Sequence, residues 1–165
     1  MVVLGAGAAG LFCAAVAGQR GRRVLVLEHN AEPGRKILIS GGGRCNFTHL
    51  DAGPSHFLSG NPHFAKSALA RFTPRDFLAV VEKHGIAYRE KAAGQLFCDG
   101  SARQIVSLLL AECRAGEVQL LTGCRLGEVG RDDLFSVATS HGRFRSRALV
   151  VAAGGLSIPS LGASD

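Results

Sequence analysis

The sequence predicts an α/β fold of the Rossmann type, with a parallel sheet, inserted helices and a three-stranded meander. Residues 1–28 give an apolar strand, the glycine turn Gly5-Ala-Gly-Ala-Ala-Gly10, a helix and a second apolar strand at 24–27. Two later runs predict further strands of the sheet, a buried one at 118–122 and one at 148–153 that ends in a glycine turn. Between them, the alternation of apolar and polar residues predicts the three strands of the meander, at 125–130, 134–140 and 143–147.

The glycine turn predicts a site for an adenine dinucleotide, with FAD favoured. Gly5 lets the chain turn off its strand, Gly7 lets backbone approach a pyrophosphate, and Gly10 lets the helix lie close to the sheet. The phosphates would lie at the helix N-terminus, where N–H groups and the positive dipole end favour an anion. Glu28 has the spacing of a carboxylate that binds the adenosine ribose, and a carboxylate there disfavours the 2′-phosphate of NADP.

The uncharged residues 1–18 have an alternative interpretation as an export or membrane segment. Ala15-Val-Ala17 is similar to a small-residue cleavage site, and arginines follow it. A signal peptide carries basic residues before its apolar core, and a spanning helix needs about 20 apolar residues. No basic residue precedes this core, and its glycines weaken a helix, so the dinucleotide turn is favoured.

Composition indicates a soluble, globular protein that we expect in the cytoplasm. Of its 165 residues, 47% are hydrophobic and 19% are charged, which excludes a disordered chain. Five cysteines without a CxxC motif indicate reduced thiols, and the spacing of His49, His56 and His63 matches no metal site. The net charge of +6 suits a pyrophosphate, while one tyrosine and no tryptophan argue against a nucleic-acid partner.

A long insertion is expected after Glu28. The stretch up to about Gly60 is rich in glycine and proline and too long for a simple connection, which predicts a ligand-binding loop. Capping boxes open two of the helices that follow, at Thr73 and Ser101. The expected order is a helix, a second helix, two short strands and a third helix, at 61–72, 73–85, 86–90, 95–98 and 101–116.

Three segments resemble one bacterial family: GRKILISGGGRCNFT at 34–48, GQLFCDGSARQIV at 94–106 and VVAAGGLSIPSLGAS at 150–164. They are similar to the FAD flavoproteins called aminoacetone-oxidase-like, or YhiN/BaiN-type and HI0933-like. The resemblance implies the FAD-binding domain of a two-dinucleotide flavoprotein, with residues 1–165 as its N-terminal part and the first strand clipped. The substrate domain would lie outside this chain, so these residues alone are expected to be inactive.

The resemblance also implies cofactor contacts by position. The pyrophosphate would contact Gly5, Gly7, Ala8, Ala9, Gly10 and Gly154, the adenosine ribose Glu28, and the adenine the backbone of Leu126. Two cations would bind the phosphates or the adjoining ribose, Arg35 and Lys36. A glycine-rich loop would bend under the flavin with Ser40, Gly42, Gly43, Arg44, Cys45 and Asn46. Where the family usually has a threonine this chain has Ala153, so we expect backbone to replace that hydroxyl.

These features favour an FAD-dependent oxidoreductase that oxidises a small amine or reduces a conjugated enone, with NAD(P)H or oxygen as the other partner. One alternative is a non-catalytic nucleotide-binding or basic RNA-interaction module, and another is an NAD-only dehydrogenase domain. No metal site, membrane partner or catalytic residue is predicted. Cys45 is a candidate redox nucleophile, but no second cysteine is near it in sequence, so a loop residue is the favoured interpretation.

Overall fold

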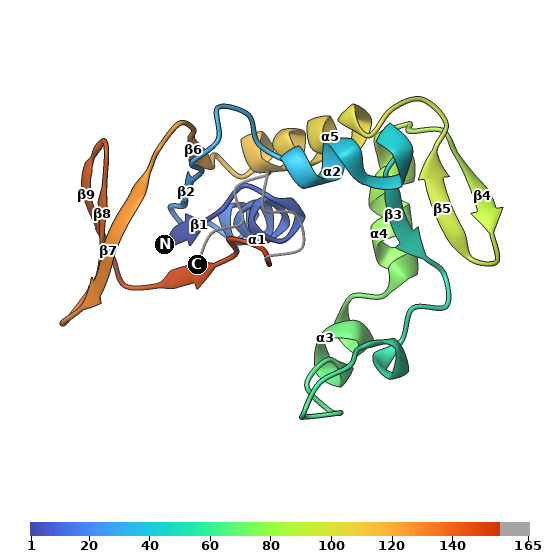
Figure 1. Ribbon diagram of the computed structural model, residues 1–165, viewed down its shortest axis with the longest axis horizontal. Coiled ribbons are helices and arrows are strands. Elements are labelled where there is room, and N and C mark those ends of the chain that lie inside the picture. Colours follow the sequence, from blue (N-terminus) through green and yellow to red (C-terminus); the bar gives the residue numbers. More distant parts are fainter. Residues whose placement is uncertain (156–165) are drawn as a thin grey trace. The chain divides into compact units, whose positions relative to one another are not determined.

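The computed structural model describes residues 1–155, which form two compact units (Figure 1). The first unit is formed by Met1–Ile37 together with the chain from Val106 onward, and the second by Leu38–Ile105. The predicted family segment at 150–164 lies largely outside the described residues. Within residues 1–155, the helices are too short or too polar to cross a membrane.

A parallel sheet forms the centre of the first unit, with the strand order β10–β1–β2–β6. In chain order its strands are β1 (Val2–Leu4), β2 (Leu25–Leu27), β6 (Gln119–Leu121) and β10 (Leu149–Val151). This arrangement confirms the predicted fold class. The prediction that 118–122 is buried is wrong, because β6 lies at an edge of the described sheet and leaves Gln119 exposed.

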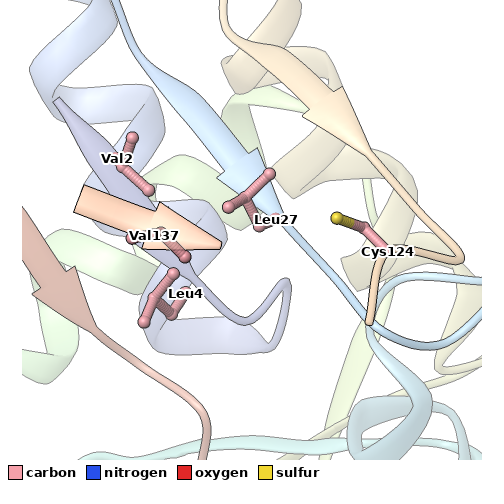
Figure 2. Close-up of a cluster of buried hydrophobic side chains, with 5 residues drawn as sticks. All are labelled: Val2, Leu4, Leu27, Cys124 and Val137. Carbon is pink, nitrogen blue, oxygen red and sulfur yellow. The ribbon is translucent and has the colours of Figure 1, made fainter. Parts of the chain in front are cut away.

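Side chains of the central strands alternate between the two faces of the sheet. Val2, Leu4 and Leu27 pack with Cys124 and Val137 in a buried cluster on one face (Figure 2). Val137 belongs to the antiparallel meander of β7 (Leu126–Arg131), β8 (Phe135–Thr139) and β9 (Gly142–Ser146), which confirms the three predicted strands. The meander therefore contributes to the core of the first unit.

Two helices complete the first unit, α1 (Ala8–Gln19) and the part of α5 (Arg103–Ala115) that follows Ile105. They lie close together because small residues meet between them: a Cβ on Gly18 would collide with the carbonyl oxygen of Gly116. The Cys113 thiol also donates to the Leu11 carbonyl oxygen (3.3 Å). The helix that the sequence predicts from Ser101 to Gly116 is thus confirmed.

The second unit contains an antiparallel sheet in the order β3–β5–β4. Its strands are β3 (Asn46–His49), β4 (Tyr88–Ala92) and β5 (Gln95–Cys98). Helix α4 (Pro74–Lys83) packs against β3, and the Phe47 ring lies 6.3 Å from that of Phe77 and 5.9 Å from that of Tyr88. The predicted capping box opens α4, because Thr73 Oγ1 accepts from the Asp76 N–H and Asp76 Oδ2 accepts from the Thr73 N–H.

The stretch after Glu28 is more ordered than a loop, which corrects the sequence prediction. It contains α2 (Arg35–Ile39), η1 (Ser40–Gly43), β3 and η2 (Pro54–His56). The following helix, α3, is Lys66–Arg71, so the predicted start at Asn61 is also wrong. Asn61 Oδ1 accepts from the His63 N–H (3.0 Å), and this local bond holds the chain in a turn before the helix begins.

Candidate functional site

The glycine turn between β1 and α1 combines two tightly packed positions with one open position. Gly5 has a φ of +98°, and a Cβ there would collide with the Ala152 carbonyl oxygen. A Cβ on Gly10 would collide with the carbonyl oxygen of Gly5. Nothing lies within 4 Å of a Cβ placed on Gly7. Packing therefore requires Gly5 and Gly10, whereas Gly7 leaves the backbone open to a ligand, as a pyrophosphate site needs.

The N-terminus of α1 is at this open position. Gly7 is the N-cap residue and has no side chain to bond the first turn, and the Leu11 N–H donates to its carbonyl oxygen (3.0 Å). The N–H groups of Ala8, Ala9 and Gly10 come before that first helical bond, so the helix itself provides them with no acceptor. Together with the dipole of a 12-residue helix, these N–H groups form a site for an anion.

Glu28 follows β2 and is buried, with 6% of its surface exposed. Its Oε2 accepts from the Ala6 N–H in the glycine turn (2.7 Å). Its Oε1 accepts from the backbone N–H of Asn30 (2.8 Å) and from Asn30 Nδ2 (2.7 Å). Each carboxylate oxygen has two lone pairs, so Oε2 retains capacity to accept from a ribose hydroxyl. The structure thus places Glu28 beside the turn, as the spacing predicts.

Asn30 is a positioning residue that sequence reasoning missed. Besides its two bonds to Glu28, its Oδ1 accepts from Arg35 Nη1 (2.6 Å), so the asparagine links the carboxylate to a predicted phosphate-binding cation. Its sequence signal is weak: an asparagine two residues after a strand is common in turns of every function.

Lys36 and Gly154 lie together at the same edge of the sheet. The Gly34 N–H donates to the Ala6 carbonyl oxygen (2.8 Å), which holds the start of α2 against the glycine turn. Lys36 Nζ then donates to the carbonyl oxygen of Gly155 (3.3 Å), in the turn that follows β10. The carboxyl ends of β1, β2 and β10 therefore bring Gly154, Lys36 and the glycine turn to one edge, where open α/β sheets bind ligands.

Leu126 lies farther along the chain that leaves Glu28. The N–H groups of Gly123 and Cys124 donate to the carbonyl oxygens of Asn30 and Glu28 (both 2.9 Å), which brings this segment to the end of β2. Leu126 itself begins β7 and pairs with Thr139. Its contact with an adenine stays a prediction.

The glycine-rich loop belongs to the second unit and has an unusual backbone. Gly41, Gly42 and Gly43 have φ values of +59°, +67° and +80°, and Cys45 has a φ of +52°. A Cβ on Gly41 would lie 2.8 Å from the Asn46 nitrogen, whereas Gly42 faces open space. The loop is held by bonds from the Ala102 N–H to Gly43 and from Arg44 Nη1 to the Asp99 carbonyl oxygen.

The predicted cofactor residues are therefore divided between the two units. The loop residues Ser40, Gly42, Gly43, Arg44, Cys45 and Asn46 lie in the second, and all the others lie in the first. Contact of this loop with a flavin stays a prediction.

The environment of Cys45 does not favour a nucleophile. The residue is buried, and burial raises the pKa of its thiol, an effect that a hydrogen bond with Ser40 opposes. Nucleophilic cysteines are partly exposed and have lowered pKa values, because the thiolate is the reactive form. Burial also raises the pKa of Cys98 to about 11. Within residues 1–155, no cluster of histidine, cysteine and acidic residues has the arrangement of a metal site.

A cavity of about 710 Å³ lies elsewhere in the first unit. Its lining includes Met1, Arg23 and Gln119, from the amino ends of the parallel strands. The glycine turn lies at the carboxyl ends, so this cavity is not part of the dinucleotide site.

Two curated relatives resemble the chain over nearly its whole length. It is 54% identical, over 99% of its residues, to an Escherichia coli protein named "Ribosomal RNA dihydrouridine synthase" and covers 41% of that protein. It is 28% identical, over 97% of its residues, to a Clostridium scindens protein named "3-dehydro-bile acid delta(4,6)-reductase" and covers 40% of it. The chain thus spans about two fifths of the length of these relatives.

A comparison with solved structures shows the fold. The 3-ketosteroid-delta4-(5alpha)-dehydrogenase of Rhodococcus jostii RHA1 superposes with a TM-score of 0.65 at 17% identity, over 93% of this chain and 45% of that one. The model of the HI0933-like protein Rossmann domain matches residues 1–165, which agrees with the parallel sheet and the glycine turn. The chain therefore belongs to the HI0933-like family and contains its Rossmann domain.

Proposed function

We propose that these residues form the FAD-binding part of an oxidoreductase. The observation that carries the proposal is the pairing of Gly7, open at the N-terminus of α1, with Glu28, whose carboxylate is fixed beside it by the Ala6 N–H. An adenine dinucleotide presents a pyrophosphate and a ribose diol at this separation along a Rossmann sheet. The residues present fit both groups.

Each residue of the site has a binding role in this proposal. The N–H groups of Ala8, Ala9 and Gly10 would bind the pyrophosphate, and Glu28 would accept from the ribose hydroxyls. Lys36 and Arg35 would add positive charge near the phosphates. When bound and reduced, FAD supplies a hydride, and the protein orients it and excludes competing reactions.

The substrate class that we propose is a C=C bond conjugated to a carbonyl group. The names of both relatives describe saturation of C=C bonds. In uridine, the C5=C6 bond is conjugated to the C4 carbonyl, so a hydride added at C6 and a proton at C5 give dihydrouridine. Two electrons are consumed for each product, and reduced nicotinamide, NADH or NADPH, would supply them. The 54% identity to the E. coli protein favours uridine in ribosomal RNA as the substrate.

This proposal departs from the expectation of a small-molecule substrate without a nucleic-acid partner. That expectation remains the second candidate, because the C. scindens relative is named for a bile acid. The residues that bind either substrate would lie in the part of the protein outside residues 1–165. A cytoplasmic location stays a prediction from the cysteines, and it agrees with both candidates.

The test is product formation by the full-length protein. The protein, FAD and NADPH or NADH are incubated with ribosomal RNA from a strain that lacks the gene, and dihydrouridine is measured by nucleoside mass spectrometry. We expect dihydrouridine to appear only with both the protein and the reduced nicotinamide. Flavin that is reoxidised by a small enone but leaves the RNA unchanged would favour the second candidate, and RNA binding without flavin would favour a non-catalytic module.

A further inference from the structure

One end of the second unit exposes apolar side chains. Leu58, Phe64 and Phe57 have 97%, 53% and 43% of their surface exposed. The two phenylalanine rings contact each other edge to face, with centroids 6.4 Å apart. They flank the connection between η2 and α3 (Figure 1). This surface cannot be explained by the core of the second unit, because its rings point outward.

The same part of the chain is basic and free of acids. Between Asp51 and Asp76 the sequence contains no aspartate or glutamate, but it contains Lys66, Arg71 and Arg75, all of which are exposed. The histidines of this segment, His56 and His63, are exposed as well. No carboxylate of the segment neutralises these charges, so their field is available to an anionic partner.

Exposed aromatic rings interleaved with cations are the chemistry that binds unpaired nucleotides. Bases stack on aromatic faces, and phosphates bind to lysine and arginine. We propose that residues 55–75 are a contact surface for an unpaired segment of RNA, with Phe57 and Phe64 stacking on bases and the three cations binding phosphates. This inference rests on the proposed RNA substrate, and it assigns the substrate contact to residues that lie apart from the glycine turn.

Charge decides between RNA and the other occupant that the surface could have. The relatives are longer than this chain, and another part of the protein could cover the apolar rings. Such an internal interface would not need an acid-free basic segment, whereas RNA does. Sequence analysis missed this feature because it relied on tyrosine and tryptophan, and exposed phenylalanines cannot be distinguished from core phenylalanines by sequence alone.

Binding of a labelled single-stranded RNA to the full-length protein, followed by fluorescence anisotropy at several salt concentrations, tests the proposal. In the first variant, Phe57→Leu and Phe64→Leu keep the apolar surface but remove both rings. In the second, Lys66→Gln and Arg71→Gln remove two cations. The matched control, Arg145→Gln with Arg147→Gln, removes two exposed cations from the first unit.

We expect the first variant to raise the Kd by about fivefold or more for each lost stack. The second variant should lower the slope of log K against log salt by about 1.4, from about 0.7 for each phosphate contact. The control should change neither, and FAD content should be unchanged in all three. Wild-type RNA binding by the phenylalanine variant would overturn the proposal.

Two further readouts separate the possible failures. If Phe57→Ala with Phe64→Ala lowers the melting temperature while RNA binding stays normal, the rest of the protein covers this surface and the inference is wrong. If the wild-type protein binds RNA through these residues but forms no dihydrouridine, the surface stands and the proposed function fails. If dihydrouridine forms at the wild-type rate in every variant, the proposed function stands and the surface is wrong.

Discussion

Gly10→Ala is expected to destabilise the first unit, whereas Gly7→Asp is expected to leave the fold intact and abolish FAD binding. A Cβ on Gly10 would collide with the backbone of Gly5, and neither the helix nor the turn has room to yield. Overpacking of this kind costs about 1–3 kcal/mol, and the backbone contact places this variant at the upper end.

Gly7 differs from Gly10 in two respects. It has an ordinary φ of −82° and open space where a Cβ would lie. As an N-cap residue, aspartate stabilises helices, but its carboxylate would repel the pyrophosphate of FAD. Thermal melting and the flavin absorption of each purified variant measure the two effects. A Gly7→Asp protein that retains FAD would contradict the assignment of the pyrophosphate to this position.

Glu28→Gln is expected to lower both stability and FAD affinity. Both oxygens of the Glu28 carboxylate accept hydrogen bonds from N–H groups, one from Ala6 and the other from Asn30. A glutamine has one amide oxygen, so its NH₂ group must face one of these donors. An unsatisfied buried donor costs about 1–3 kcal/mol, and the ribose loses a charged acceptor.

Urea unfolding and FAD titration check this expectation. Glu32→Gln is the matched control, because Glu32 is exposed and lies in the same connection. We expect the control to behave as wild type and Glu28→Gln to bind FAD at least about tenfold more weakly, a loss of about 1.4 kcal/mol. Unchanged stability of Glu28→Gln would show that the bond from Ala6 contributes nothing to the fold.

The sequence was sufficient to predict the strands of the first unit and their ligand edge. Gly5, Gly7 and Gly10 have distinct physical requirements, and their spacing relative to Glu28 reports the length of one helix and one strand. The capping box at Thr73 was equally informative, because its two hydrogen bonds join residues three positions apart. Features of this kind are local, so a single sequence contains them.

Features that depend on distant partners could not be predicted. β3 is a strand because Asn46 and Thr48 pair with Phe97 and Leu96, far along the chain. Asn30 acquires its role only when Arg35 and Glu28 lie on either side of it. In the same way, exposure of Phe57 and Phe64 depends on the packing of the whole second unit. Composition alone assigns such residues to the core.

The most direct test of the account is the visible absorption spectrum of the full-length protein after incubation with FAD and gel filtration. The account predicts flavin bands that elute with the protein at about one FAD per chain, and a colourless Gly7→Asp variant that elutes at the same volume. A folded wild-type protein that elutes without flavin would contradict the assignment of Gly5–Gly10 and Glu28 to an FAD site.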